Sequence, residues 1–111
     1  MKIIKATKNW GVVYHYFGDN YKFALYTYND DPYVTYLSNV WVNDESRGQG
    51  IGDKLLNVAE EMAIQHNAKV ICLKVLVDTW VHDWYQRQGF IDYIDDEDSN
   101  YVWMKKVLKD K

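Results

Sequence analysis

Three of the six glycines in this 111-residue chain fall within five positions, in the stretch "WVNDESRGQGIGDKLL" (41–56). Directly after Gly48, Gly50 and Gly52, the sequence takes on the apolar period of a helix. The first turn of a helix has backbone N–H groups without partners and a partial positive charge, which together favour an anion such as phosphate. Glycine lets the backbone approach such a ligand closely and adopt a positive φ. Phosphate binding is therefore the chemistry that this stretch could perform.

Three interpretations of the stretch compete. In the first, it is a plain glycine-rich turn in which Asp53 complements the helix dipole. The second is a dinucleotide-binding fingerprint, but that motif is G-x-G-x-x-G after a strand of a βαβ unit, whereas here the spacing is G-x-G-x-G after a meander. A P-loop is excluded, because no Gly-Lys-Ser/Thr follows. The third interpretation is a family resemblance, which depends on a second motif and on the order of the elements.

The elements that position this turn follow from the pattern of the whole chain. Aromatic and β-branched runs between Gly, Asn, Asp and Pro clusters predict an antiparallel meander over residues 1–42, with strands at 11–17, 21–28 and 33–42 and Pro32 in a turn. After residue 50 a helix is expected, and its apolar stripe comprises Ile51, Leu55, Val58, Ala59 and Met62. The glycines thus lie where a strand leads into a helix.

The rest of the chain alternates between strands and a helix. The apolar run at 68–77 predicts a central strand covered on both faces. A short helix follows within 79–90, and Gly89 ends it with Phe90 as the hydrophobic contact after the glycine. "FIDYI" and "YVWMKKVL" predict a terminal hairpin. The fold class is therefore α+β, a mixed sheet with helices on its faces, in which a meander is followed by β-α-β-α-β-β.

Composition narrows the classes of protein. The length favours one domain over residues 1–111. A net charge of −3 provides no electrostatic footprint for nucleic acid or an anionic membrane, so neither is an expected partner. Cys72 is the only cysteine, which excludes an internal disulfide and indicates a small buried hydrophobe in a reducing compartment. With no signal-peptide or membrane-spanning stretch, a cytoplasmic location is expected, and no metal site is predicted.

Two motifs together resemble the GNAT N-acetyltransferase superfamily. Arg47-Gly48-Gln49-Gly50-Ile51-Gly52 resembles the R/Q-x-x-G-x-G/A acyl-CoA loop of that family, and it lies between a strand and the long helix as it does there. "DTWVHDWYQRQGF" (78–90) is similar to the family segment N-x-x-A-x-x-L-Y-x-x-x-G-F, with Tyr85, Gly89 and Phe90 in register. The resemblance covers residues 33–108. The first thirty residues match less well, because the family usually has two helices near its N-terminus.

The resemblance implies a binding site for acetyl-CoA as cosubstrate. Backbone N–H groups of the loop would hold the pyrophosphate, and main-chain groups of the preceding strand would bind the pantetheine and the acetyl carbonyl. Tyr85 would act as the general acid, protonating or hydrogen-bonding the departing thiolate; a helix aromatic packed on the sheet is the other interpretation. The residues that the resemblance assigns to acetyl-CoA are Val40, Trp41, Val42, Arg47, Gly48, Gln49, Gly50, Ile51, Gly52, Asp78 and Tyr85.

Three positions depart from the family pattern. Gln49 stands where a basic residue is common, Asp78 replaces Asn but would serve equally well as a helix N-cap, and Val81 replaces Ala. The strand at 33–42 also contains no carboxylate, and Tyr36 occupies the position of the glutamate base that many members use.

The general base therefore stays open. An amine of pKa near 10.4 is protonated at pH 7, and removing its proton costs about 4.6 kcal/mol, so the site must provide a way for this proton to leave. Tyr36 in the strand at 33–42 and His82 in the second motif are the candidates, although a surface position is the favoured interpretation of His82. His15 and proton loss to solvent through water are further options.

The sequence thus predicts an N-acetyltransferase that transfers an acetyl group from acetyl-CoA to a primary amine by direct attack. The acceptor is a small molecule or, because the missing helices would leave the groove open, a protein lysine or N-terminus. The alternatives are a GNAT-like module that binds acyl-CoA or a protein without turnover, and a small interaction domain with an aromatic sheet face. A solvated turn is favoured over acceptor attraction for Asp95, Asp96, Glu97 and Asp98. A monomer or a homodimer is expected.

Overall fold

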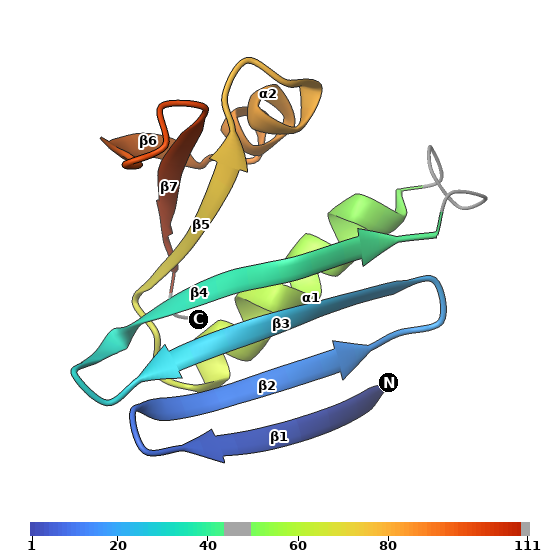
Figure 1. Ribbon diagram of the computed structural model, residues 1–111. Helices are drawn as coiled ribbons and strands as arrows, with labels where there is room; N and C mark the ends of the chain where they lie inside the picture. Colours follow the sequence, from blue (N-terminus) through green and yellow to red (C-terminus); the bar gives the residue numbers. More distant parts are fainter. Residues whose placement is uncertain (44–49, 110–111) are drawn as a thin grey trace.

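The computed structural model describes residues 1–43 and 50–109, and its elements follow the predicted order (Figure 1). They are β1 (Lys2–Lys8), β2 (Gly11–Phe17), β3 (Tyr21–Tyr28), β4 (Asp31–Val42), α1 (Ile51–Gln65), β5 (Val70–Leu76), α2 (Trp80–Arg87), β6 (Ile91–Asp95) and β7 (Tyr101–Val107). The strands form a seven-stranded sheet in the order β1-β2-β3-β4-β5-β7-β6. Its pairings are antiparallel except for that of β4 with β5. The prediction of an α+β fold with a mixed sheet is confirmed.

The N-terminal meander contains four strands, and no helix lies within residues 1–43. The predicted bounds of β2 and β3 are confirmed, whereas β1 was not singled out from the sequence. Pro32 is not in the turn, which is formed by Asn29 and Asp30, but in β4. It lies where the β3–β4 register shifts, between the pairs Tyr28–Asp31 and Thr27–Thr35, so its missing N–H removes no regular ladder bond.

Helix α1 connects the parallel strands β4 and β5 and packs against β3 and β4. Leu55 and Ala59 of the predicted stripe are buried, but Leu56 and Ala63 are buried as well, so the apolar face is wider than expected. Ile51, Val58 and Met62 are only partly buried against the core. In the described part of the chain, neither helix is long and apolar enough to cross a membrane.

Helix α2 ends in the glycine cap that the sequence predicts. Gly89 has φ 98°, its N–H donates to the carbonyl of Gln86, and the N–H of Phe90 donates to the carbonyl of Tyr85. The Phe90 ring packs on the Tyr85 ring at a centroid distance of 5.4 Å. These are the two hydrogen bonds and the hydrophobic contact of a Schellman motif. The motif fixes Tyr85 relative to the start of β6.

The parallel pairing of β4 with β5 is short. It joins Val34–Tyr36 to Val70–Cys72, after which the two strands diverge (Figure 1). Beyond Cys72, Lys74 and Leu76 are exposed, so the prediction that this strand is covered on both faces holds only for its first half. The divergence opens a gap in the middle of the sheet.

A bulge in β4 changes which side chains face the helices. Between the pairs Lys22–Trp41 and Ala24–Ser38, one residue of β3 opposes two of β4, Asn39 and Val40, and Asn39 has φ 54°. Before the bulge Leu37 lies in the core with α1, whereas after it the even-numbered Val42 packs against that core. The extra residue therefore turns Val40 and Val42 toward α1 and Trp41 to the opposite face.

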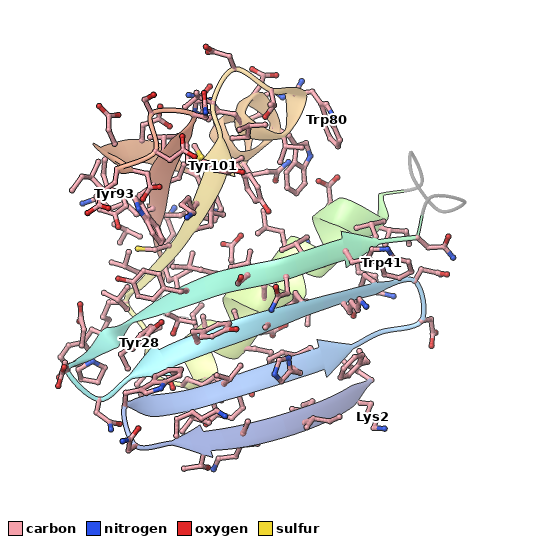
Figure 2. All side chains as sticks on the ribbon, viewed as in Figure 1. Lys2, Tyr28, Trp41, Trp80, Tyr93 and Tyr101 are labelled. Carbon is pink, nitrogen blue, oxygen red and sulfur yellow. The ribbon has the colours of Figure 1, made fainter. Side chains whose placement is uncertain are left out.

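The two faces of the sheet differ in what covers them. Helix α1 lies behind β2, β3 and β4 in Figure 1, and no described helix covers the face toward the viewer. Figure 2 shows Tyr28 and Trp41 on this uncovered face. It is rich in aromatic rings, including Trp10, Tyr26, Tyr28, Tyr36 and Trp103.

The C-terminal end of α1 is anchored to β2 through His66. The Tyr16 hydroxyl lies 3.1 Å from His66 Nε2, and the Tyr14 ring stacks on the imidazole at 4.1 Å. Burial, with a smaller contribution from the nearby Lys5 charge, lowers the pKa of His66 below its ordinary value of 6.5. Protonating this ring is therefore harder in the folded chain than in the unfolded chain.

This anchor predicts a pH dependence of stability. Between the lowered pKa of His66 and 6.5, the unfolded chain binds more protons than the folded chain, so the free energy of unfolding falls as pH falls. Above 6.5 the contribution of neutral His66 to this free energy is fully present. His66→Gln keeps an acceptor for Tyr16 but cannot titrate, so it should flatten this slope. Urea titrations between about pH 7.5 and 5 measure it, and equal slopes in both proteins would contradict the assignment.

Candidate functional site

Two clefts lie on either side of the gap between β4 and β5. The helix-side cleft, of about 690 Å³, lies between the end of β4, the first turns of α1 and the exposed side of α2. The sheet-face cleft, of about 790 Å³, opens on the aromatic face of the sheet. Val40, Val81 and Tyr85 line both clefts. The gap between the strands therefore brings two binding volumes together at these three side chains, and each is large enough for a small-molecule ligand.

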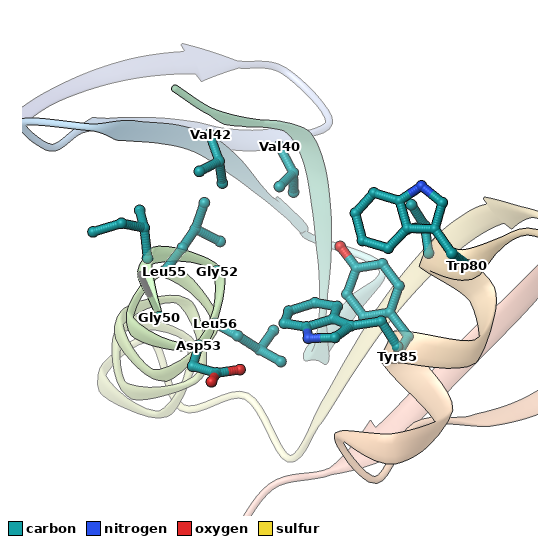
Figure 3. Close-up of a pocket in the computed structure, with 12 residues that line it drawn as sticks. Val40, Val42, Gly50, Gly52, Asp53, Leu55, Leu56, Trp80 and Tyr85 are labelled. Carbon is teal, nitrogen blue, oxygen red and sulfur yellow. The ribbon is translucent and has the colours of Figure 1, made fainter. Parts of the chain in front are cut away.

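The helix-side cleft combines apolar walls with an open helix N-terminus (Figure 3). Gly50 is the N-cap of α1 with φ 78°, and no described side chain caps this end. A Cβ built on Gly50 meets no atom of the described residues within 4 Å, and Gly50 lines the cleft. The wall residues are Val40, Val42, Ile51, Gly52, Asp53, Leu55, Leu56, Trp80, Val81, Trp84 and Tyr85. These features suit a ligand with an anionic end and an apolar arm.

One charge opposes an anion in this cleft. Asp53 lies in the first turn of α1, and its carboxylate accepts a hydrogen bond of 3.2 Å from the side-chain amide of Gln88 beyond α2. This bond draws the carboxylate toward α2 and ties the two helices together. A Cβ on Gly52 would stand 3.5 Å from the Trp84 ring, which shows how closely α2 approaches α1.

Tyr85 occupies the junction of the two clefts. Its side chain is 7% exposed, and Figure 3 shows the hydroxyl directed into the space between Val40 and α2. Among the described residues the hydroxyl has no hydrogen-bond partner. Burial raises the pKa of Tyr85 to about 12, so the phenol stays protonated at neutral pH. It is a donor at the wall of both clefts that a ligand can satisfy.

The start of α2 corrects one prediction. Thr79, not Asp78, is the N-cap: its hydroxyl accepts from the His82 N–H at 3.2 Å and donates to the Leu76 carbonyl at 2.8 Å. Asp78 instead has φ 58°, the left-handed conformation that short polar residues tolerate best. Thr79 has the extended backbone that a cap requires, which Asp78 lacks. The Asp78 side chain lines neither cleft.

His82 is buried rather than at the surface, which corrects the favoured interpretation of this residue. Its Nδ1 accepts from the backbone N–H of Asp78 at 3.3 Å, and its Nε2 lies 2.9 Å from Asp92 Oδ1 in β6. Because Nδ1 accepts, Nε2 carries the ring proton and donates a hydrogen bond to Asp92. Both nitrogens are therefore engaged, and His82 lines neither cleft. The sequence could not reveal this, since Asp92 lies beyond the end of the helix.

Tyr36 lines the sheet-face cleft. Its ring meets the rings of Tyr28 and Trp103 edge to face, at centroid distances of 5.3 and 5.9 Å. Burial raises the pKa of Tyr36, with smaller contributions from Cys72, Asp31 and Tyr28. A phenol with a raised pKa is a hydrogen-bond donor at neutral pH rather than a proton acceptor.

Several predicted loop residues cannot be evaluated, because Arg47, Gly48 and Gln49 lie outside the described residues. Val40, Val42, Gly50, Ile51, Gly52 and Tyr85 come together in the helix-side cleft. Trp41 has its side chain on the other face, where Lys22 Nζ lies 5.5 Å from its ring. Among the described residues, no group of three or more His, Cys, Asp or Glu side chains could hold a metal ion.

The sequence analysis missed part of the cleft walls. Trp80 and Trp84, one turn apart on α2, line the helix-side cleft together with Tyr85. The spacing i, i+4, i+5 of these aromatic residues is the signal that could have found them. Tyr28 and Trp103 come from strands distant in the chain, so no local spacing connects them.

Comparison with known proteins finds a matching family and solved structures of the same fold. The profile of the Acetyltransferase (GNAT) family matches residues 12–90. A search of curated protein sequences finds no match. The solved structure of a candidate acyl-CoA N-acyltransferase from Klebsiella pneumoniae is similar, with TM-score 0.76 and 18% identity over 94% of this chain and 77% of the other.

Two further solved structures have the same fold. Nourseothricin acetyltransferase gives a TM-score of 0.72 at 19% identity, covering 91% of this chain and 67% of that protein. Escherichia coli ElaA gives 0.69 at 20% identity, covering 90% and 70%. At these identities the likeness establishes the fold.

The cap of α2 gives a testable prediction. Thr79→Ala should lower the free energy of unfolding by about 1 kcal/mol, because the N–H of His82 loses its partner. Asp78→Gly is the matched control and should be neutral or stabilising, since glycine adopts φ 58° without strain. Urea denaturation measures both. A larger loss for Asp78→Gly than for Thr79→Ala would show that Asp78 caps the helix after all.

Proposed function

This chain belongs to the acetyltransferase (GNAT) family, and we propose that it transfers the acetyl group of acetyl-CoA to a primary amine. The observation that carries the proposal is the meeting of two clefts at Tyr85. A direct transfer needs the thioester and the amine to be bound at once with their reacting atoms in contact. Two volumes that join through a gap in the sheet meet this requirement, with acetyl-CoA on the helix side and the amine on the aromatic face.

The helix-side cleft has the features that acetyl-CoA requires. The uncapped N-terminus of α1 at Gly50 would bind the pyrophosphate through backbone N–H groups, with the loop before it, including Arg47, completing the site. Beyond Tyr36, β4 pairs with no described strand on the side toward β5, so backbone groups of residues 40–42 would be available to the pantetheine arm. A β4 N–H directed at the acetyl carbonyl would stabilise the oxyanion.

In the proposed transfer, bound acetyl-CoA supplies the thioester that the neutral amine attacks. The C–N bond forms, the C–S bond breaks, and the amine loses a proton. Tyr85 would donate a hydrogen bond to the leaving sulfur. Complete proton transfer from a phenol of pKa about 12 to a thiolate whose thiol has a pKa near 8.5 would be uphill by about 5 kcal/mol. We therefore propose hydrogen bonding, not protonation, as the role of Tyr85.

The proton of the amine is proposed to leave to solvent through the sheet-face cleft. Two observations support this route over the bases considered from the sequence: both nitrogens of His82 are engaged, and Tyr36 has a raised pKa. The same two observations favour one alternative, a module that binds acyl-CoA without turnover. Release of free CoA thiol in the presence of an amine distinguishes the enzyme from the module.

Acetyl-CoA binding is tested at Gly50. Acetyl-CoA at a hundredfold excess over its Kd should stabilise the protein by about 2.7 kcal/mol, and NAD at equal concentration should do less. Gly50→Glu directs a negative side chain into the open space of the cleft and should weaken acetyl-CoA binding at least tenfold. Gly50→Asn, which tolerates the left-handed backbone, is the control with the smaller effect. Unchanged affinity in folded Gly50→Glu, measured by calorimetry, would refute the site.

Turnover is tested with Tyr85→Phe, which removes only the hydroxyl. Losing a hydrogen bond to a developing thiolate should lower kcat by roughly ten- to a hundredfold, while the Kd of acetyl-CoA changes less than about threefold. Stability should be unchanged or slightly higher, because the hydroxyl of this buried side chain has no partner among the described residues. Full activity combined with lower stability would make Tyr85 a structural aromatic instead.

A further inference from the structure

We propose that the acceptor is an extended polycationic amine: one amine reacts beside Tyr85, and a second ammonium binds an aromatic box formed by Tyr28, Tyr36 and Trp103 near Asp31. This inference rests on the proposed function, because it names the substrate class for the sheet-face cleft. Four features of that cleft carry it: the geometry of the rings, the balance of charge, the distance between its two ends, and the Tyr85 hydroxyl at one end.

The rings of the aromatic box are arranged to receive a cation. Tyr36 stands at 90° to Tyr28 and at 86° to Trp103, so neighbouring rings form corners instead of a closed stack. The negative faces of perpendicular rings can attract an ammonium from two directions. The same wall already attracts a cation of the protein itself, since Lys74 Nζ lies 5.7 Å from the centre of Trp103 and 5.2 Å from that of Tyr101.

The charge around the box also favours a cation. Asp30 and Asp31 line the cleft at the β3–β4 turn, and Asp31 is the strand partner of Tyr28. Lys74 is the cationic side chain among the described lining residues, and Asp96 already pairs with it at 3.7 Å. The two aspartates therefore leave the cleft with an excess of negative charge. An acceptor that carries a carboxylate at this end would be repelled.

The separation of the two ends sets the length of the acceptor. Val40 lies at the junction with the helix-side cleft, and Tyr36 lies four residues earlier on the same strand, which is at most about 13 Å away because the bulge at Asn39 shortens the strand. The side chains between them include Leu37, Leu73 and Val75, which suit a methylene chain. A short diamine would reach only one end, whereas a linear triamine or tetraamine can reach both.

The reactive end of the cleft is marked by Tyr85. The Tyr85 side chain is more than nine-tenths buried, and its hydroxyl, which has no partner among the described residues, is directed into the junction. A hydroxyl without a protein partner at this place is a donor for a bound group. Substrate selection and chemistry would thus occur at opposite ends of one cleft, with the aromatic box selecting the cation and the junction performing the transfer.

The test compares three linear primary amines at saturating acetyl-CoA: spermidine, hexylamine and 6-aminohexanoate. We expect kcat/KM for spermidine to exceed that for hexylamine at least tenfold, and 6-aminohexanoate to be the poorest acceptor. Asp31→Asn should raise the KM for spermidine roughly three- to tenfold, with kcat within twofold and hexylamine unaffected. Glu97→Gln, which makes the same charge change on the exposed β6–β7 turn, is the matched control and should have no effect.

A binding measurement separates this inference from the proposed function. Calorimetry of spermidine with the protein–CoA complex needs no turnover, and binding should weaken in Asp31→Asn and in Tyr36→Leu but not in Glu97→Gln. Such binding without acetylation of any amine would reject the enzyme and support the box. Equal kcat/KM for spermidine and hexylamine, an Asp31→Asn enzyme identical to the wild type, preference for a lysine peptide over spermidine, or absence of spermidine binding would each overturn the inference.

Discussion

The early end of the parallel pairing between β4 and β5 is the constraint on which the rest of the structure depends. Hydrogen bonds join these strands only at Val34–Tyr36 and Val70–Cys72, and beyond them the sheet opens. A continuous sheet would separate its two faces completely, because every strand pair closes the space between them. The gap is what allows the helix-side cleft and the sheet-face cleft to share walls. It also leaves backbone groups of β4 without a strand partner, which a ligand can use.

The bulge in β4 directs apolar side chains beside the gap into the helix-side cleft. Without the extra residue at Asn39, the alternation that buries Leu37 would continue, and Val40 and Val42 would face away from α1. The bulge reverses the alternation where the strands diverge, so apolar side chains meet the open N-terminus of α1 at Gly50. A local irregularity of one residue thereby sets which chemistry each face presents.

Helix α2 is fixed at both ends, and this fixes Tyr85. At its start, Thr79 caps the helix and His82 connects the left-handed Asp78 to Asp92 of β6. At its end, Gly89 and Phe90 close the Schellman motif on the carbonyl and the ring of Tyr85. A buried phenol that must serve two clefts needs such restraint, since a small displacement of a reacting group costs much of the rate. His82 contributes to this restraint through its two hydrogen bonds.

The sequence by itself determined the elements and half of the helix-side cleft. Hydrophobic period and turn residues predicted the meander, both helices and the hairpin. The R-x-x-G-x-G loop located the N-terminus of α1, and the Tyr85–Gly89–Phe90 spacing located the cap at the end of α2. These patterns can be read locally because they arise from interactions within a few residues. Only the tertiary structure decided that His82 is buried against Asp92, that Thr79 replaces Asp78 as the cap, and that Tyr28, Tyr36 and Trp103 form one wall. The partners in these contacts come from different strands, or depend on a backbone angle that composition does not fix. Their proximity is set by sheet order and register, which hydrophobic periodicity leaves undetermined.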